Sequence, residues 1–293
     1  MKPPAFDYHA PRDLGETLRV LAEAGPHGKV LAGGQSLIPL LNMRLAAPSH
    51  LVDINRVAGL ATIGVEDGGV RVGALARHAA VERDPVVARA QPLLPEALKL
   101  VAHPVIRNRG TVVGSLVHAD PSAELPAVLT VLGGSVRLAR DGGRERDVPA
   151  AEFFTGPLES AVQPGELAVS AFFPALAPRT GTAFREVARR HGDYALAGAA
   201  ALVTVDDDLR IVSARVACVS VGPVPLLLDV SRVCDRRPAA SVDWAAVAAA
   251  VQDRVDPEGD IHASAAYRRH LTGVLAERAL RAAAEAAKEG TDE

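Results

Sequence analysis

Cysteine is scarce in this chain of 293 residues, where only Cys218 and Cys234 are present. Iron–sulfur clusters take about four thiolate ligands, so the chain cannot hold such a cluster by itself. Sparse cysteine is also typical of a reducing compartment in which thiols stay free. Cys218 lies in an apolar run, and we expect it to be a small core residue.

Aromatic residues and positive charge are also in short supply. Aromatics make up 3% of the chain, and the net charge is −3. A nucleic-acid partner usually requires a basic excess or a stacking platform, so none is expected. No apolar run approaches the roughly 20 residues needed to span a bilayer, and the first residues lack the apolar core of a secretory signal. We therefore expect a cytoplasmic protein without an integral membrane segment.

Familiar catalytic and metal-binding motifs are absent as well. The nine histidines are scattered and form neither H-x-x-x-H nor H-E-x-x-H. A G-x-S-x-G nucleophile elbow is missing too. The sequence therefore predicts no metal site and no catalytic acid, base or nucleophile.

Two glycine-centred segments are present instead, at residues 32–36 (Ala-Gly-Gly-Gln-Ser) and 110–115 (Gly-Thr-Val-Val-Gly-Ser). Each follows or contains apolar residues and offers backbone N–H groups with little side-chain bulk in front of them. Such N–H groups can cradle phosphate oxygens, so two segments favour a long anionic cofactor such as a dinucleotide. Glycine pairs are also common in ordinary loops. Neither segment matches G-x-G-x-x-G or G-x-x-x-x-G-K-[ST], so neither a Rossmann fold nor a P-loop is predicted.

A β-α-β-like pattern surrounds the first segment. The periodicity predicts a helix over residues 11–25 that ends at Gly25. A strand at 29–32 enters the glycine turn, and a second strand is expected at 51–54. Between them we expect a helix over 37–45 whose first turn is capped by the side chain of Ser36.

The second segment lies in a longer pattern of hairpins and helices. Residues 61–74 predict a hairpin with its turn at 67–69, and residues 135–139 predict a strand before a hairpin turn at 141–143. A helical stretch interrupted by prolines is expected over 77–101.

Polar side chains cluster around the second glycine segment. Arg107 and Arg109 put two forked donors beside it. Gly110 and Gly114 are alternatively explained as bulges in a strand. Asp120 suits the hydroxyls of a ribose, or it caps a helix ahead of the apolar run at Leu125.

A cluster of proline and glycine at 174–181 predicts a domain boundary. Strands at 195–205, 209–216 and 217–221 follow, with a hairpin tip at 206–208. Helices are expected at 243–255 and 264–287. The length also suggests two domains. We expect a first domain over 1–176, divided into 1–56 and 57–176, and a second domain over 177–288.

Residues 31–39 and 105–115, taken together, resemble the FAD-binding (medium) subunits of molybdenum-containing hydroxylases. This family includes the flavoprotein chain of aerobic carbon monoxide dehydrogenase and the flavin domain of xanthine dehydrogenase. The resemblance continues at 184–195 and 267–280 and covers nearly the whole chain. It implies an α+β fold, with a two-subdomain FAD-binding domain (vanillyl-alcohol-oxidase/PCMH-like) followed by a smaller C-terminal α/β domain.

The resemblance also implies FAD as cofactor, and it implies roles for individual residues. Residues 32–36 would hold the pyrophosphate, and 111–115 would pack against it and the flavin from the other side. Asp120 and Glu124 match positions near the adenosine and ribose, and Tyr194 matches a position beside the isoalloxazine. The implied cofactor-binding residues are Leu31, Ala32, Gly33, Gly34, Gln35, Ser36, Leu37, Val101, Ile106, Gly110, Thr111, Gly114, Ser115, Asp120, Glu124, Leu167, Arg185 and Tyr194.

The sequence departs from the family pattern at two positions. Gln35 stands where relatives often have His, Asn or Thr, and Val113 stands where many have the first glycine of a pair. A valine at 113 would crowd the approach of the backbone to a cofactor.

In family terms, the chain is expected to accept electrons from the [2Fe–2S] clusters of a small partner subunit and to pass them to an outer acceptor. A molybdopterin-containing large subunit would oxidise the substrate. Two alternatives are a free-standing FAD-dependent oxidoreductase and a flavin-less binding or assembly protein on the same fold.

Overall fold

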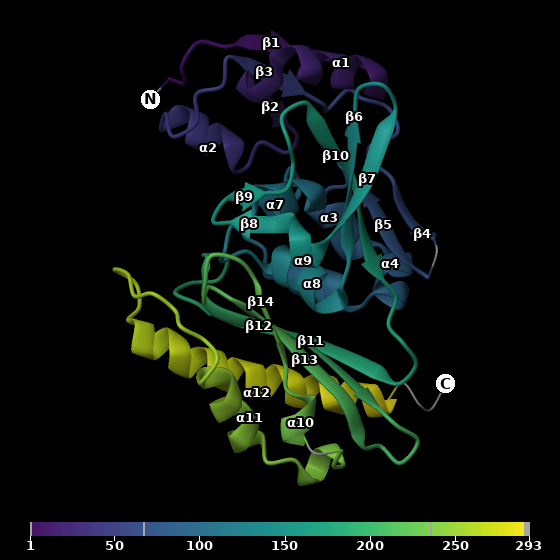
Figure 1. The fold of residues 1–293 in the computed structure, drawn as a ribbon, viewed down its shortest axis with the longest axis vertical. Coiled ribbons are helices and arrows are strands. Elements are labelled where there is room, and N and C mark those ends of the chain that lie inside the picture. Colours follow the sequence, from purple (N-terminus) through teal and green to yellow (C-terminus); the bar gives the residue numbers. More distant parts are fainter. Residues whose placement is uncertain (1, 67, 235, 290–293) are drawn as a thin grey trace.

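The computed structural model describes residues 2–66, 68–234 and 236–289. Figure 1 shows three layers stacked along the long axis, with the N-terminal strands and helices at one end and the long helix α12 near the other. Asp67, in the predicted hairpin turn, lies outside the described residues.

The first layer is a small parallel sheet with the order β1-β3-β2, formed by β1 (Asp7–His9), β3 (His50–Asp53) and β2 (Gly28–Leu31). Helix α1 (Leu14–Ala24) begins three residues later than predicted, because the Asp13 carboxylate accepts a hydrogen bond from the Glu16 amide at 2.8 Å and caps it there. It ends at Gly25 as predicted, where φ is +53°. A short 3₁₀ turn (Gly25–His27) leads into β2, and α2 (Leu37–Asn42) follows the first glycine segment.

The second layer is an antiparallel sheet with the order β4-β5-β10-β6-β7. The hairpin of β4 and β5 and the strand β6 confirm the sequence predictions, whereas β10 was not predicted. The strands are β4 (Ile63–Glu66), β5 (Gly69–Gly73), β6 (Ser135–Arg140), β7 (Arg144–Pro149) and β10 (Glu166–Pro174), with a separate pair β8 (Phe154–Gly156) and β9 (Glu159–Ser160).

Short helices pack against this sheet. The helical stretch predicted over 77–101 is broken near its prolines, and Pro85 begins a new helix within it. Pro104 begins another helix just after it. A proline loses no hydrogen bond at the first position of a helix, because the first N–H there has no partner within the helix. The helices are α3 (His78–Arg83), α4 (Pro85–Ala90), α5 (Leu93–Leu98), α6 (Pro104–Arg107), α7 (Val112–His118), α8 (Glu124–Leu132) and α9 (Ala150–Phe153).

The third layer is an antiparallel sheet with the order β11-β12-β13-β14. Its strands are β11 (Thr180–Ala188), β12 (Ala195–Val205), β13 (Ile211–Val219) and β14 (Leu226–Asp229), and its helices are α10 (Ser231–Cys234), α11 (Trp244–Gln252) and α12 (Ala265–Glu289), with a 3₁₀ turn at Ala239–Ser241. The prediction of two strands over 209–221 is wrong, because β13 pairs with β12 continuously across residue 216. Strand β11 was not predicted.

Strand β12 is buried on both faces. Ala197, Ala199 and Ala201 belong to the core beneath α12, whereas Ala200 and Leu202 belong to the core that includes α8. Figure 1 shows the sheet between these two helices. Because successive side chains of a strand point to opposite faces, β12 packs against α12 on one face and against α8 on the other. This strand therefore joins the third layer to the second.

Close packing of α12 on the sheet requires a glycine at 181. A Cβ placed there would overlap the Ala283 carbonyl oxygen and the Ala287 amide. We expect Gly181→Val to destabilise the protein by about 1–3 kcal/mol, because the helix must move away from β11. Thermal unfolding checks this, with Gly64→Val on β4 as the control, since that site is open. An equal melting temperature for both variants would contradict the packing described here.

Candidate cofactor-binding site

A cavity of about 490 Å³ lies where the first and second layers meet, and Tyr194 of the third layer reaches it. Its volume is in the usual range for small-molecule and cofactor sites. Residues predicted from the sequence make up much of its wall: Ala32, Gly33, Gly34, Gln35, Ser36, Leu37, Val101, Ile106, Gly110, Thr111, Gly114, Ser115, Asp120, Glu124, Leu167 and Tyr194.

Two residues of the predicted set do not line this cavity. Leu31 lies between Val30 and Ala32, which do line it, and side chains alternate along β2. Arg185 is turned to Glu96, with 2.9 Å between Nη1 and the carboxylate, and also donates to the Phe184 carbonyl oxygen at 2.7 Å. Its guanidinium therefore ties β11 to α5 instead of facing the cavity.

The two glycine segments touch through their backbones. A Cβ on Gly33 would overlap the carbonyl oxygen of Arg109 and lie 2.8 Å from the Cα of Gly110. Only glycine allows this approach. The contact brings two stretches that are far apart in sequence to one wall of the cavity.

Arg77 and Asn55 bridge the same two segments. Arg77 donates from Nη1 to the Arg109 carbonyl oxygen and from Nη2 to the Asn55 side-chain oxygen, both at 2.6 Å. The Asn55 amide donates in turn to the Ala32 carbonyl oxygen at 2.9 Å. We call Arg77 and Asn55 the clasp. It binds one backbone carbonyl oxygen of each segment and so ties the two segments together.

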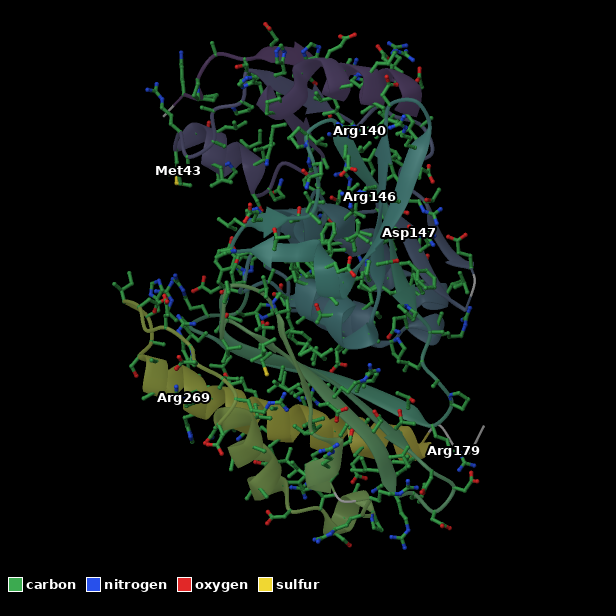
Figure 2. The ribbon with its side chains drawn as sticks, in the orientation of Figure 1. Met43, Arg140, Arg146, Asp147, Arg179 and Arg269 are labelled. Atoms are coloured by element: carbon green, nitrogen blue, oxygen red, sulfur yellow. The ribbon has the colours of Figure 1, made fainter. Side chains whose placement is uncertain are left out.

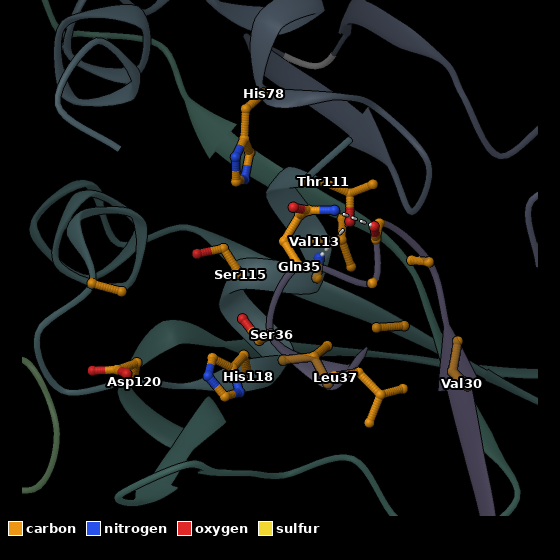
Figure 3. A pocket seen from close by; sticks show the side chains of 18 of the residues that line it. Val30, Gln35, Ser36, Leu37, His78, Thr111, Val113, Ser115, His118 and Asp120 are labelled. Carbon is orange, nitrogen blue, oxygen red and sulfur yellow. Dashed lines mark hydrogen bonds between the residues drawn. The ribbon is translucent and has the colours of Figure 1, made fainter. Parts of the chain in front are cut away.

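The first segment keeps its amides available. Within residues 2–66, 68–234 and 236–289, no hydrogen bond is made by the backbone N–H groups of Gly33, Gly34, Gln35 and Ser36. The Gln35 side chain folds back and donates to the Gly33 carbonyl oxygen at 3.0 Å (Figure 3). The predicted cap at Ser36 is wrong, because its hydroxyl makes no capping bond to α2 and its own backbone is already helical. Its side chain lies at the cavity wall instead.

The second segment begins a helix and does not form a bulged strand. Thr111 caps α7 and accepts a hydrogen bond from the Gly114 amide at 3.1 Å. A Cβ on Gly114 would lie 2.5 Å from the Thr111 hydroxyl, so this cap requires glycine. Val113 is 2% exposed and packs into the main core while also bordering the cavity.

The expectation that Arg107 and Arg109 supply donors to the site is wrong. Arg107 is buried, pairs with Glu82 at 2.8 Å and donates to the carbonyl oxygens of Val101 and Ala102. The Arg109 side chain is exposed and does not line the cavity. Lys29, which the sequence analysis did not single out, is a cationic residue that does line it.

Carboxyl groups gather at the end of the cavity near Tyr194. Asp120 accepts from the Ser122 amide at 2.8 Å and is not the cap of α8, whose capping position is Ala123. Burial raises the pKa of Glu124 to about 8, with a further contribution from Glu186. Burial also raises the pKa of Glu186 to about 7. Glu124 is therefore largely a neutral acid at pH 7, able to donate as well as accept.

Ionised Glu166 lies on another part of the wall. Its burial favours the neutral form, but hydrogen bonds from Arg146 and the Gln163 amide outweigh this and lower its pKa. Arg146, labelled on β7 in Figure 2, reaches the carboxylate at 2.8 Å.

The sequence analysis missed several wall residues, among them Lys29, His78, His118 and Glu166. For His78 no local pattern exists. It reaches the second glycine segment through an isolated bridge between Arg77 and Thr111, a pairing between residues distant in the chain.

Two protein-family models match this chain, one over each of its two parts. A family model described as the FAD binding domain in molybdopterin dehydrogenase matches residues 4–176, and one described as the CO dehydrogenase flavoprotein C-terminal domain matches residues 182–283. The chain therefore belongs to the FAD-binding medium subunits of molybdenum hydroxylases. It is an oxidoreductase subunit, and the cofactor of this family is FAD.

Relatives align along almost the whole chain. It is 43% identical over 281 residues to the 6-hydroxypseudooxynicotine dehydrogenase complex subunit alpha of Paenarthrobacter nicotinovorans, covering 96% of this chain and 95% of that protein. It is 36% identical to the carbon monoxide dehydrogenase medium chain of Hydrogenophaga pseudoflava, covering 97% and 98%. A chain of quinoline 2-oxidoreductase from Pseudomonas putida 86 superimposes with a TM-score of 0.89 at 38% identity, covering 98% of this chain and 99% of that one.

The residues of the cavity fit FAD. The open amides of residues 33–36 suit a diphosphate, and the wall extends from them to the carboxyl groups and Tyr194. No helix in the described ranges is both long and apolar enough to cross a membrane.

The backbone contact at Gly33 predicts a strong effect of a single methyl group. We expect Gly33→Ala to weaken FAD binding by about tenfold or more, because the two loops must separate. Flavin fluorescence titration of the apoprotein measures this. Gly15→Ala in α1 is the control, where the added Cβ lies 3.4 Å from the Asp13 carboxylate and alanine favours the helix. Equal FAD affinity in both variants would contradict the contact.

The burial of Glu124 predicts that the free energy of unfolding of the apoprotein depends on pH. Unfolded chains release this proton near the ordinary pKa of 4.5, whereas the folded protein keeps it to about pH 8. Stability therefore falls as pH rises through this window. We expect Glu124→Gln to melt above the wild type by a margin that grows from pH 5 to 8. Exposed Glu23→Gln is the control, and a pH-independent margin for Glu124→Gln would rule out this explanation.

Proposed function

We propose that this chain is the electron-transfer subunit of a molybdenum hydroxylase. It would take electrons from the [2Fe–2S] clusters of a small partner subunit and deliver them to an external acceptor, while a molybdopterin-containing large subunit oxidises the substrate. The observation that carries the proposal is the joining of two glycine segments at one wall of a cavity, in a chain of this family.

The names of the relatives support a role within an assembly. One relative is a subunit of a dehydrogenase complex, and another is the medium chain of a carbon monoxide dehydrogenase. By analogy the present chain works with two further subunits.

The two cysteines agree with a role in which the iron–sulfur clusters lie on another subunit. Both thiols are free and buried, and burial raises the pKa of Cys218 to about 12 and of Cys234 to about 11. Such thiols do not ligate a cluster. They also fit a reducing cytoplasm.

Each part of the cavity has a proposed task. The amides of residues 33–36 and the start of α7 hold the diphosphate from two sides. Tyr194, 67% exposed, covers the isoalloxazine at the mouth. Asp120 and neutral Glu124 lie beside Tyr194, so we place them at this end of the cofactor and not at the adenosine and ribose that the resemblance implied. When bound, FAD supplies a redox centre that takes up and gives out electrons. The chain contributes position, shielding and the local field. We also propose two domains, residues 1–176 and residues 177–288, with the first divided into residues 1–56 and 57–176.

The experiment is isolation of the native complex, followed by its visible spectrum and metal analysis. We expect bound FAD, with molybdenum and iron in near-stoichiometric amounts on partner chains and electron transfer lost when FAD is removed. FAD without metals or partners would favour a free-standing oxidoreductase. A chain that neither contains FAD nor takes it up would favour the flavin-less alternative and contradict the proposal.

A further inference from the structure

A chain of hydrogen bonds connects the third layer to the second at the end of the cavity where Tyr194 lies. Its centre is Ser220, the residue that follows β13. The Ser220 hydroxyl donates to the Ala195 carbonyl oxygen at 2.7 Å, and Ala195 directly follows Tyr194 in the chain. A carbonyl oxygen can only accept a hydrogen bond, so the single proton of this hydroxyl is used there. Ser220 therefore holds the backbone next to Tyr194.

On its other side Ser220 is bonded to the turn between α7 and α8. The hydroxyl oxygens of Ser220 and Ser122 lie 2.9 Å apart, and Ser122 is the donor because the Ser220 proton goes to Ala195. The Ser220 amide donates to the Pro121 carbonyl oxygen at 3.0 Å. The Ser122 amide in turn donates to the Asp120 carboxylate at 2.8 Å. Hydrogen bonds thus connect the Ala195 carbonyl to the Asp120 carboxylate through two serines.

The backbone of Ser220 has a conformation that serine rarely adopts. Its φ is +61°, in the left-handed region that favours glycine and is unfavourable for a residue with a Cβ. Such conformations persist only where the surrounding structure enforces them, and they cluster at functional sites. Glycine would relieve this strain but would have no hydroxyl. The hydrogen bonds of the side chain therefore explain why a serine is suited to this position.

The residues at both ends of this chain of bonds line the cavity. Tyr194 and Asp120 are wall residues, whereas Ser220 is not. Figure 3 shows Asp120 beside His118 in the wall. Asp120 is near enough to Tyr194 to raise the pKa of its phenol, although burial has the larger effect. Ser220 can therefore affect a cofactor only through the residues that it holds.

The position of the Tyr194 side chain depends on its backbone. Within the part of the chain that the structure describes, this exposed side chain makes no hydrogen bond, ion pair or ring contact. Nothing at the end of the ring fixes it. A shift of the backbone at Ala195 would therefore move Tyr194 relative to Asp120.

We infer that Ser220 is a positioning residue for the flavin end of the site. Its hydrogen bonds set the position of Tyr194 relative to Asp120, and thereby how Tyr194 covers the isoalloxazine. The inference rests on the proposed function, in which Tyr194 lies over that ring. The open amides of residues 33–36 belong to another layer and are not bonded to Ser220. Loss of the Ser220 hydroxyl should therefore affect the flavin ring and not the diphosphate.

The test uses full-length protein loaded with FAD and the variants Ser220→Ala and Ser220→Gly. Both remove the hydroxyl, but glycine also relieves the backbone strain. Ser213→Ala on the same strand is the control, because the Ser213 side chain makes no hydrogen bond within the described residues. The measurements are iodide quenching of the flavin fluorescence, the dissociation constants for FAD and ADP, and the melting temperature of the apoprotein.

We expect both Ser220 variants to show about twofold stronger iodide quenching and FAD binding weakened by about threefold, the loss expected for one hydrogen bond. ADP, which lacks the flavin, should bind as it does to the wild type. Ser220→Gly should melt above Ser220→Ala because its backbone is free of strain. The flavin measurements should nevertheless agree between the two variants, since both lack the hydroxyl.

A Tyr194→Leu variant tests whether Ser220 acts through Tyr194. By itself this change should increase iodide quenching, because the ring that covers the flavin is lost. Adding Ser220→Ala to it should increase the quenching no further, as expected when two residues act on one contact. A further increase in the double variant would overturn the inference.

Quenching and FAD affinity equal to the wild type in both Ser220 variants would overturn the inference and leave the proposed function standing. Flavin measurements that recover with the melting temperature in Ser220→Gly would overturn it as well and assign Ser220 to stability alone. Equal losses of FAD and ADP affinity would also contradict it. Failure of the wild type to take up FAD would contradict the proposed function and this inference together.

Discussion

The contact between Gly33 and the backbone of Arg109 and Gly110 is the constraint on which the site depends. Two loops from different layers can share one ligand only if their backbones approach closely, and a single Cβ at Gly33 prevents this. The clasp of Arg77 and Asn55 holds the carbonyl side of both loops. The amides of residues 33–36 make no hydrogen bond within the described residues, and these residues line the cavity.

The rest of the cavity depends on burial supplied by the C-terminal layer. Strand β12 is covered by α12 on one face and by α8 on the other, and β11 brings Glu186 close to Glu124 at the start of α8. Burial and the neighbouring carboxyl group keep Glu124 largely protonated near neutrality. His78 is kept neutral in the same way. Burial therefore keeps these two ionisable groups of the cavity wall uncharged near neutral pH.

The sequence predicted those parts of the fold and site that local patterns encode. Both glycine segments, the hairpin of β4 and β5, and the end of α1 at Gly25 follow from spacing and turn chemistry. Strand β11 was missed because it follows a proline-rich stretch and carries Arg185 and Glu186 in mid-strand. His78, Arg77 and Asn55 were missed because each acts on a residue far along the chain. Arg107 was misread because its donors serve Glu82 and two carbonyls, a packing role that no local pattern reveals.

The most direct measurement is a double-mutant cycle on the clasp, with Arg77→Met, Asn55→Ala and the double variant titrated with FAD. If the clasp holds the two loops together, each single change weakens FAD binding, and the double variant binds little worse than the weaker single variant, a coupling of about 1 kcal/mol or more. Additive effects, or FAD affinities equal to the wild type in all three variants, would show that the two loops do not depend on the clasp to form one site.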